Sequence, residues 1–306
     1  MPPVWNESPA RGQLTPGPFD PDNTEAYLRW RENKLANAIT RTDELIVEIN
    51  DPRALTAAEH TALLERCRRS NMAIYASTAS DIDENAVRQF GNQFGLEHID
   101  SNWLASDQSV TRLTVSTDDS PRQAFIPYTD RAIKWHTDGY YNTLDRQVRS
   151  LLLHCAQRAA KGGGNRLMDH EIAYLMLRDA NTDFIHALSA PDAMTIPERT
   201  DEQGVARPAQ TGPVFSLDPA SGDLHMRYTA RTRSIRWKQD ATTLAAVAML
   251  EKLLASDSPH IHHACLEKGM GLLCNNVLHD RAAFADDSAA PRLLFRARYL
   301  DRIAGT

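Results

Sequence analysis

The chain has 306 residues, a formal net charge of −6 at pH 7, 42% hydrophobic residues and 24% charged residues. This composition is ordinary for a globular protein, and the negative charge gives no general attraction to nucleic acid or anionic lipid. No apolar run approaches the ~18 residues that a membrane span needs, and the N-terminus has no basic patch followed by an apolar core. We therefore expect a cytoplasmic protein with neither a nucleic-acid nor a membrane partner.

The cysteine usage supports the same compartment. The four cysteines have no metal-type spacing and are too few for a disulfide framework. They are predicted to be reduced thiols of the core, and they are Cys67, Cys155, Cys265 and Cys274.

The first hundred residues favour helices that cover a sheet. Residues 1–22, rich in Pro, Gly and Asp, are predicted to lie irregularly on the surface. Asp22 and Glu25 are predicted to cap a helix that runs to about residue 39. Its predicted apolar stripe consists of Leu28, Leu35 and Ile39. A capping box at residues 56–59 opens a second helix, residues 72–75 form a short strand, and a third helix runs from near Asp83 to Gly95.

The remainder of the chain favours strands with two further helices. Strands are predicted near Leu113 and Val115, and over 148–155, 224–228, 271–275 and 293–300. Residues 118–131 are predicted to be a mobile segment, 162–164 a glycine turn, and 190–213 a long loop or lid. Helices are predicted over 171–178 and after Asp240, the second with an apolar face of Leu244, Val247, Leu250 and Leu254. The pattern by itself predicts a mixed, β-rich core.

One stretch, residues 135–142, carries an imidazole and a carboxylate two residues apart, His136 and Asp138. Alternate residues of an extended segment point to the same side, so both side chains are placed to bind one metal ion. The predicted third ligand is His279, with His260, His262 and His263 as alternatives. Two histidines and one carboxylate leave open positions on the metal, as in non-heme Fe(II) oxygenases.

These motifs occur in an order that resembles a known family. The His-x-Asp triplet is followed by a glycine turn in residues 161–165, then by His279, then by Arg292 and Arg296. From about Phe94 to Leu300 the chain resembles the taurine dioxygenase-like (TauD/TfdA) family of Fe(II)/2-oxoglutarate oxygenases. The resemblance implies an α+β fold, a double-stranded β-helix (jelly-roll) core with flanking helices, in one domain over residues 1–306.

The resemblance also implies the chemistry. Fe(II), the cosubstrate 2-oxoglutarate and O2 would act together on a small-molecule substrate, hydroxylating it and releasing succinate and CO2. It assigns the iron to His136, Asp138 and His279. Arg292 would bind the distal carboxylate of 2-oxoglutarate, since a guanidinium forms a fork that suits a carboxylate. Asn165 stands where relatives often carry a Thr that bonds the cosubstrate.

Substrate contacts are expected from residues around the motif, where the chain departs from taurine dioxygenase. Asp100 stands in place of a histidine that grips a sulfonate, so we expect an amine-bearing acid or zwitterion rather than taurine. Arg296 matches a second family arginine near the substrate, although Asp100 is equally consistent with a capping or loop residue. Further substrate candidates are Tyr140, Tyr141 and Arg231, for each of which ordinary packing is the alternative.

Two other classes of function stay open at this point. The same iron chemistry gives desaturation or cyclisation in place of hydroxylation. A non-catalytic jelly roll, or a zinc protein that uses the same three ligands with a bound water, would have no use for Arg292 or the glycine turn. A homo-oligomer is compatible with everything above.

Overall fold

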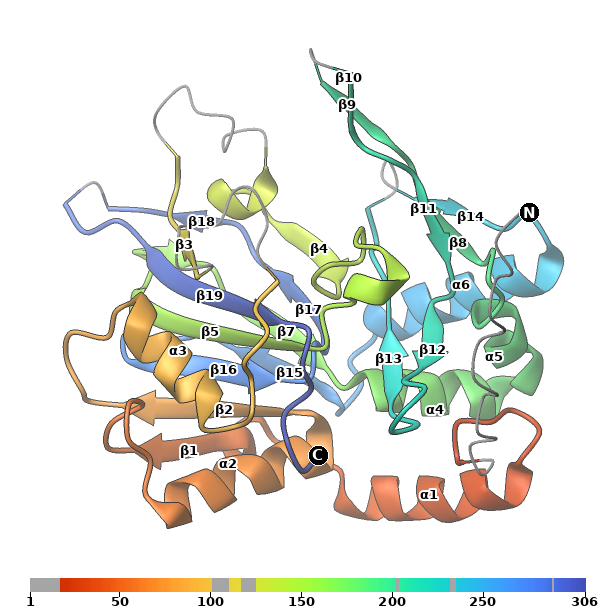
Figure 1. Ribbon diagram of the computed structural model, residues 1–306, viewed down its shortest axis with the longest axis horizontal. Coiled ribbons are helices and arrows are strands. Elements are labelled where there is room, and N and C mark those ends of the chain that lie inside the picture. The colour runs from red at the N-terminus through yellow and green to blue at the C-terminus, as the bar shows by residue number, and fades with distance from the viewer. Residues whose placement is uncertain (1–16, 101–109, 117–124, 202–203, 232–234, 288) are drawn as a thin grey trace, which may run out of the picture.

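The computed structural model describes residues 17–100, 110–116, 125–201, 204–231, 235–287 and 289–306. Two facing sheets form its centre (Figure 1). The larger has the order β1 (Ile46–Ile49), β2 (Met72–Ser77), β16 (Met270–Cys274), β5 (Ser150–Gln157), β19 (Leu293–Tyr299), β3 (Thr111–Leu113). The smaller has the order β15 (Ile261–Ala264), β7 (Asn165–Met168), β17 (Leu278–Arg281), β4 (Ile133–His136). All neighbouring strands are antiparallel except β1 and β2.

The alternation of side chains along each strand assigns one face to the barrel interior. On β5, Leu151 and Leu153 pack in the inner cluster, whereas Leu152 packs in the cluster beneath the outer helices. On β7, Leu167 faces inward and Met168 outward. Because this alternation has a period of two, inward polar side chains of these strands lie between the two sheets. The structure thus confirms the expected α+β jelly roll.

Helices cover both outer faces. The larger sheet packs against α2 (Ala57–Ser70) and α3 (Glu84–Asn92), and the smaller against α4 (His170–Ala180), α5 (Thr182–Leu188) and α6 (Ala241–Leu254) (Figure 1). The N-terminal α1 (Thr24–Asn37) packs against α4 through Tyr27, whose hydroxyl donates to Leu175 O at 3.2 Å. Short 3-10 turns are η1 (Thr42–Leu45), η3 (Ile126–Tyr128) and η4 (Leu144–Arg146).

The starts of α2 and α3 follow the sequence signals closely, whereas the start of α1 does not. The box of Thr56 and Glu59 caps α2, and Asp83 caps α3. The cap of α1 was predicted wrongly: Asn23 accepts from Ala26 N, not Asp22. The predicted stripe of that helix is also wrong at Leu28, which is 53% exposed, because α1 presents Tyr27 and Lys34 to the core.

Residues 190–213 are the largest departure from prediction. Instead of an unstructured loop they contain β8 (Met194–Ile196), β9 (Arg199–Asp201), β10 (Gly204–Arg207) and β11 (Gln210–Gly212). The β9–β10 hairpin projects beyond the body of the molecule (Figure 1). These strands were not predicted because the segment contains prolines and each strand is only three or four residues long. The other short strands are β6 (Lys161–Gly162), β12 (Phe215–Leu217), β13 (Leu224–Met226), β14 (Arg236–Trp237) and β18 (Phe284–Ala285).

Smaller corrections concern single residues. Leu244 is 42% exposed on α6, whereas Val247, Leu250 and Leu254 are buried as predicted. Cys265 is exposed, so only three of the four free thiols belong to the core. Residues 1–16 and the first half of the predicted mobile segment, 118–124, lie outside the described residues. No helix in the described ranges is long and apolar enough to cross a membrane.

Candidate metal centre

Sheet register brings the three predicted ligands together in the barrel interior. His279 on β17 is the direct partner of His136 at the end of β4, and their ring centroids are 4.2 Å apart. Asp138 follows two residues later, with Oδ1 3.6 Å from His136 Nε2. One ligand atom from each of the three residues lies within 4.8 Å of the others, and all three side chains are buried. Only this group of three met that spacing in the described part of the chain.

Backbone contacts fix the tautomer of both imidazoles. Nδ1 of His136 lies 2.9 Å from Lys134 O, and Nδ1 of His279 lies 2.9 Å from Val277 O. A carbonyl oxygen can only accept, so each Nδ1 carries the proton and each Nε2 keeps its lone pair. This is the usual arrangement of metal-binding histidines.

The charges of the cluster also suit a divalent cation. Burial and the neighbouring His136 lower the pKa of His279 to about 4, so this imidazole is neutral at pH 7. Burial by itself would raise the pKa of Asp138, but Arg296, His136 and Arg298 outweigh it and hold that pKa well below its usual range. Two imidazoles and one carboxylate are a fit for Fe(II) with open coordination positions.

Asn276 positions the carboxylate, and the sequence analysis missed it. Its Oδ1 accepts from Asp138 N at 2.8 Å, while its Nδ2 donates to Asp138 O at 2.9 Å and to Val148 O at 2.6 Å. Asn276 has φ 47°, a left-handed conformation that Asn tolerates better than most residues. The sequence offered one signal for such a role, namely that Asn276 lies three residues before His279. Gly139, which directly follows Asp138, has φ 69° and leaves no room for a Cβ, which would lie 2.4 Å from Val148 Cγ2.

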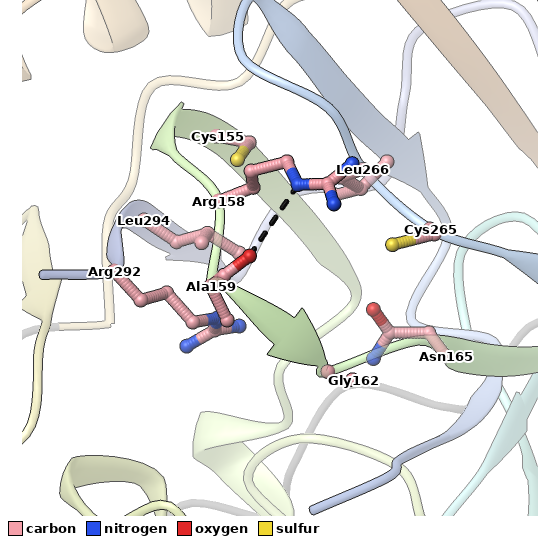
Figure 2. A pocket seen from close by; sticks show the side chains of 10 residues that line it. Cys155, Arg158, Ala159, Gly162, Asn165, Cys265, Leu266, Arg292 and Leu294 are labelled. Atoms are coloured by element: carbon pink, nitrogen blue, oxygen red, sulfur yellow. Dashed lines mark hydrogen bonds between the residues drawn. The ribbon is translucent and has the colours of Figure 1, made fainter. Parts of the chain in front are cut away.

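Arg292 and Asn165, the predicted cosubstrate residues, line one small cavity together with Cys155 and Cys265 (Figure 2). Arg292 is buried, and its guanidinium lies 4.8 Å from the ring centre of Phe284. The glycine turn is close by: a Cβ on Gly163 would lie 3.9 Å from Arg292 Nε. Asn165 Nδ2 donates to Asp280 O at 2.6 Å.

A second, more open hollow of about 640 Å³ shares Asn165 and Cys265 with the first and is also lined by Lys134 and Arg281. Neither hollow is lined by the three candidate metal ligands. The structure thus places Arg292 and Asn165 together beside the glycine turn, while Arg296 lies elsewhere.

Arg296 and Arg298 extend from β19 into the barrel on the same face as Leu294. Arg296 Nη1 lies 3.3 Å from Asp138 Oδ2, so this arginine contacts the metal-binding carboxylate directly. Arg298 Nη2 lies 2.9 Å from Asp100 Oδ2, and its Nη1 donates to the Tyr141 hydroxyl at 2.8 Å. Asp100 also accepts from Arg146 Nη2 at 3.2 Å, so its charge is already paired within the protein.

The tyrosines after the metal motif stand beside it. The Tyr140 ring is edge-on to His136 at 6.4 Å and to Tyr141 at 5.2 Å. Arg231 Nη1 lies 3.4 Å from the Tyr140 hydroxyl. The segment before Arg231 joins the edge of the smaller sheet, because Thr229 bridges His136. Contacts therefore link the predicted substrate residues to the candidate metal centre, Arg296 through Asp138 and the others through Tyr140, which packs on His136.

A jelly roll with two histidines and one carboxylate facing its interior defines a protein of the non-heme iron oxygenase class. Residues 33–298 match the family described as taurine catabolism dioxygenase TauD, TfdA family, and the chain belongs to this family. Membership confirms the resemblance seen in the motifs. The family is one of 2-oxoglutarate-dependent non-heme iron dioxygenases, and solved neighbours of the same fold hold Fe with alpha-ketoglutaric acid or Mn(II) with N-oxalylglycine.

Individual relatives agree with this placement. A uridine-5'-phosphate dioxygenase from Amycolatopsis is 31% identical over 172 residues, which are 55% of this chain. The matched part spans 60% of that relative's length. The non-heme iron oxygenase OrfP, solved with Fe and alpha-ketoglutaric acid, shares the fold with a TM-score of 0.60 at 15% identity over 80% of each chain. An asparagine oxygenase, solved with Fe(II), 2S,3S-3-hydroxyasparagine and succinate, matches 92% of this chain and 85% of its own at 14% identity, with a TM-score of 0.58.

Proposed function

We propose that the protein is a single-domain oxygenase that hydroxylates a C–H bond of a small polar metabolite, anionic or zwitterionic, and converts 2-oxoglutarate to succinate and CO2. The observation that carries the proposal is the buried cluster of His136, Asp138 and His279, with both Nε2 atoms free for a metal. Bound Fe(II), with 2-oxoglutarate and O2, supplies the oxidising power for such a reaction.

The protein's own residues have distinct tasks in this proposal. His136, Asp138 and His279 hold the iron, and Asn276 keeps the Asp138 backbone in place. Arg292, buried and held against Phe284, binds the distal carboxylate of 2-oxoglutarate, with Asn165 beside it. Arg296 forms an ion pair with Oδ2 of Asp138. Its positive charge stabilises the ionised form of this carboxylate.

The substrate class follows from the charges around Tyr140 and Tyr141. Asp100 was expected to attract an amine, but Arg298 and Arg146 already accompany it. A substrate amine would have to compete with two guanidinium groups for that carboxylate. An anionic group on the substrate is therefore better supported than an amine. The relatives agree in size and polarity, since their names and bound molecules include a nucleotide and an amino acid.

A zinc hydrolase with the same three ligands is the competing function, and desaturation or cyclisation the competing outcome. Anaerobic Fe(II) and 2-oxoglutarate should together give a weak visible charge-transfer band in the wild-type protein. His279→Ala should abolish this band, because one of three ligands is lost. The exposed His263→Ala is the matched control and should keep it.

Admission of O2 then separates the functions. Substrate-stimulated succinate, measured by mass spectrometry against a metabolite panel, supports the oxygenase, and the mass of the organic product distinguishes hydroxylation from desaturation. If His279→Ala binds iron and 2-oxoglutarate as tightly as the wild type, the ligand assignment is wrong. Zinc-stimulated hydrolysis without succinate formation would replace the oxygenase with the hydrolase.

A further inference from the structure

Around the tyrosines that follow the metal motif, arginines outnumber the acids that could balance them. Arg207 ends β10, and its guanidinium lies 5.7 Å from the ring centre of Tyr141. Arg231 reaches the Tyr140 hydroxyl from the opposite chain segment. Arg227 lies beneath them, 3% exposed. In the described ranges, none of these three arginines forms an ion pair with an acidic side chain.

The neighbouring arginines on β19, in contrast, are each paired with an acid. Arg296 is paired with Asp138, and Arg298 is paired with Asp100. Asp138 is thus matched by one guanidinium, and Asp100 by two, since Arg146 also contacts it. The positive charge of Arg207, Arg227 and Arg231 comes on top of these pairs.

Arg227 supplies charge and hydrogen-bonds backbone carbonyls through all three of its nitrogens. Its Nε donates to Tyr140 O at 2.7 Å, and its Nη2 donates to Gln210 O at 2.7 Å. Burial and, after it, the charge of Arg207 lower the pKa of Arg227 to about 10. A buried guanidinium with only neutral partners favours an anion nearby.

Arg207 retains a donor for a ligand. Its Nη2 donates to Pro197 O at 2.7 Å, but its Nη1 is buried with no hydrogen-bond partner. Burial lowers the pKa of Arg207. Arg231 thus lies at the Tyr140 hydroxyl and Arg207 over the Tyr141 ring, and the two tyrosine rings pack edge-on beside the His136 ring. Both residues are only partly buried as a whole, although Arg207 Nη1 itself is covered.

We propose that Arg207 and Arg231, which lie against the neighbouring side chains of Tyr141 and Tyr140, bind a phosphate monoester group of the substrate. This inference rests on the proposed oxygenase function and narrows its substrate to small phosphorylated metabolites. A carboxylate or sulfonate brings one negative charge to three guanidinium groups that have no acidic partner among the described residues. A phosphate monoester brings about two at neutral pH and three terminal oxygens that accept from donors on different sides.

Calorimetry on the full chain, loaded anaerobically with Fe(II) and 2-oxoglutarate at pH 8, tests this directly. The probes are methyl phosphate, methanesulfonate and acetate at matched ionic strength. Methyl phosphate should bind about tenfold more tightly than the other two, since the second charge and third oxygen add a charge-assisted contact. Equal affinity for the three probes, or no binding of methyl phosphate, overturns the proposal.

Variants identify the residues. Arg207→Ala and Arg231→Ala should each weaken methyl phosphate binding about tenfold or more, and Arg207→Lys should recover part of that loss because it restores the charge. Arg236→Ala removes an exposed arginine of β14 and should leave the affinity unchanged. Wild-type affinity in the Arg207→Ala/Arg231→Ala double variant overturns the assignment.

The two proposals fail in different ways. If the oxygenase function is wrong, Fe(II) and 2-oxoglutarate give no visible band and no succinate, whatever methyl phosphate does. If only the phosphate site is wrong, the band and uncoupled succinate formation are present, and methyl phosphate shows no preference over acetate.

Discussion

Asn276 holds the metal-binding carboxylate in place although it contributes no ligand atom. Its side-chain amide pairs with both the N–H and the C=O of Asp138 and reaches Val148 as well. In other metal sites, removal of a residue that orients a ligand in this way typically lowers metal affinity about 10- to 100-fold. The candidate centre is therefore larger than its three ligands.

Replacement of Asn276 by glycine should show this effect. Glycine adopts the observed φ of 47° without strain, so Asn276→Gly removes the amide and leaves the backbone conformation accessible. We expect iron affinity to fall about 10- to 100-fold in anaerobic titration. Asn181→Gly, which alters the cap of the distant helix α5, is the control for general destabilisation and should bind iron normally. Unchanged iron affinity in Asn276→Gly would remove its positioning role.

Arg292 gives a second prediction for a single residue. A charge-assisted fork to a carboxylate contributes about 1.5–3 kcal/mol, or about ten- to a hundredfold in affinity. Arg292→Ala should raise the apparent dissociation constant for 2-oxoglutarate by that factor, measured from the charge-transfer band. Arg296→Ala is the informative comparison, because Arg296 contacts Asp138 instead. A larger loss of 2-oxoglutarate affinity with Arg296→Ala than with Arg292→Ala would move the cosubstrate role to Arg296.

Among the elements, α2 shows how local signals build the outer layer without touching the site. The Thr56 hydroxyl accepts from Glu59 N, and the Glu59 carboxylate accepts from Thr56 N. Helix α2 then places Leu63 and Cys67 against the outer face of the larger sheet, on the opposite side from the inward-facing metal ligands.

Thr56→Ala should therefore destabilise the protein by about 1 kcal/mol, the usual effect of losing an N-cap, and leave iron affinity unchanged. Thr61→Ala, an exposed position within the same helix, is the matched control. Alanine has the higher helix propensity, so Thr61→Ala should be neutral or slightly stabilising in chemical denaturation. A loss of iron affinity in Thr56→Ala at full folding would show that α2 is coupled to the metal centre.

At the scale of the whole molecule, buried histidines tie stability to pH. His154 and His262 are each 2% exposed, and burial lowers the pKa of each to about 4. In the unfolded chain a histidine titrates near a pKa of about 6.5. Between these values the unfolded state binds protons that the folded state does not, so stability falls as the pH is lowered from about 6.5 to about 4.

The metal-free protein should accordingly lose up to about 1.4 kcal/mol per pH unit for each such histidine in that window. Denaturation curves at pH 7 and pH 5 measure the loss. His154→Gln should flatten the dependence, because one titrating group is removed, whereas the exposed His263→Gln should leave it unchanged. A pH profile of His154→Gln that matches the wild type in slope would assign the acid sensitivity to other groups.

The sequence by itself determined the features that depend on neighbours along the chain. Bonds and periodicity within a few residues set three of these features. They are the helix caps such as Thr56 and Asp83, the glycine turn, and the placement of His136 and Asp138 on the same inward side. The order of the motifs was sufficient to indicate the family and the jelly roll. The same local rules failed in 190–213, because strands of three or four residues carry too little pattern to be recognised.

Only the tertiary structure decided which distant residues meet. The register of β17 against β4 places His279 opposite His136, and a shift by one residue would turn His279 to the outer face. The same holds for the ion pair of Asp100 with Arg298, which the spacing of the two residues does not reveal. Register, long-range ion pairs and the side chains that hold a carboxylate in place depend on how whole sheets pack, and this information is spread over the entire chain.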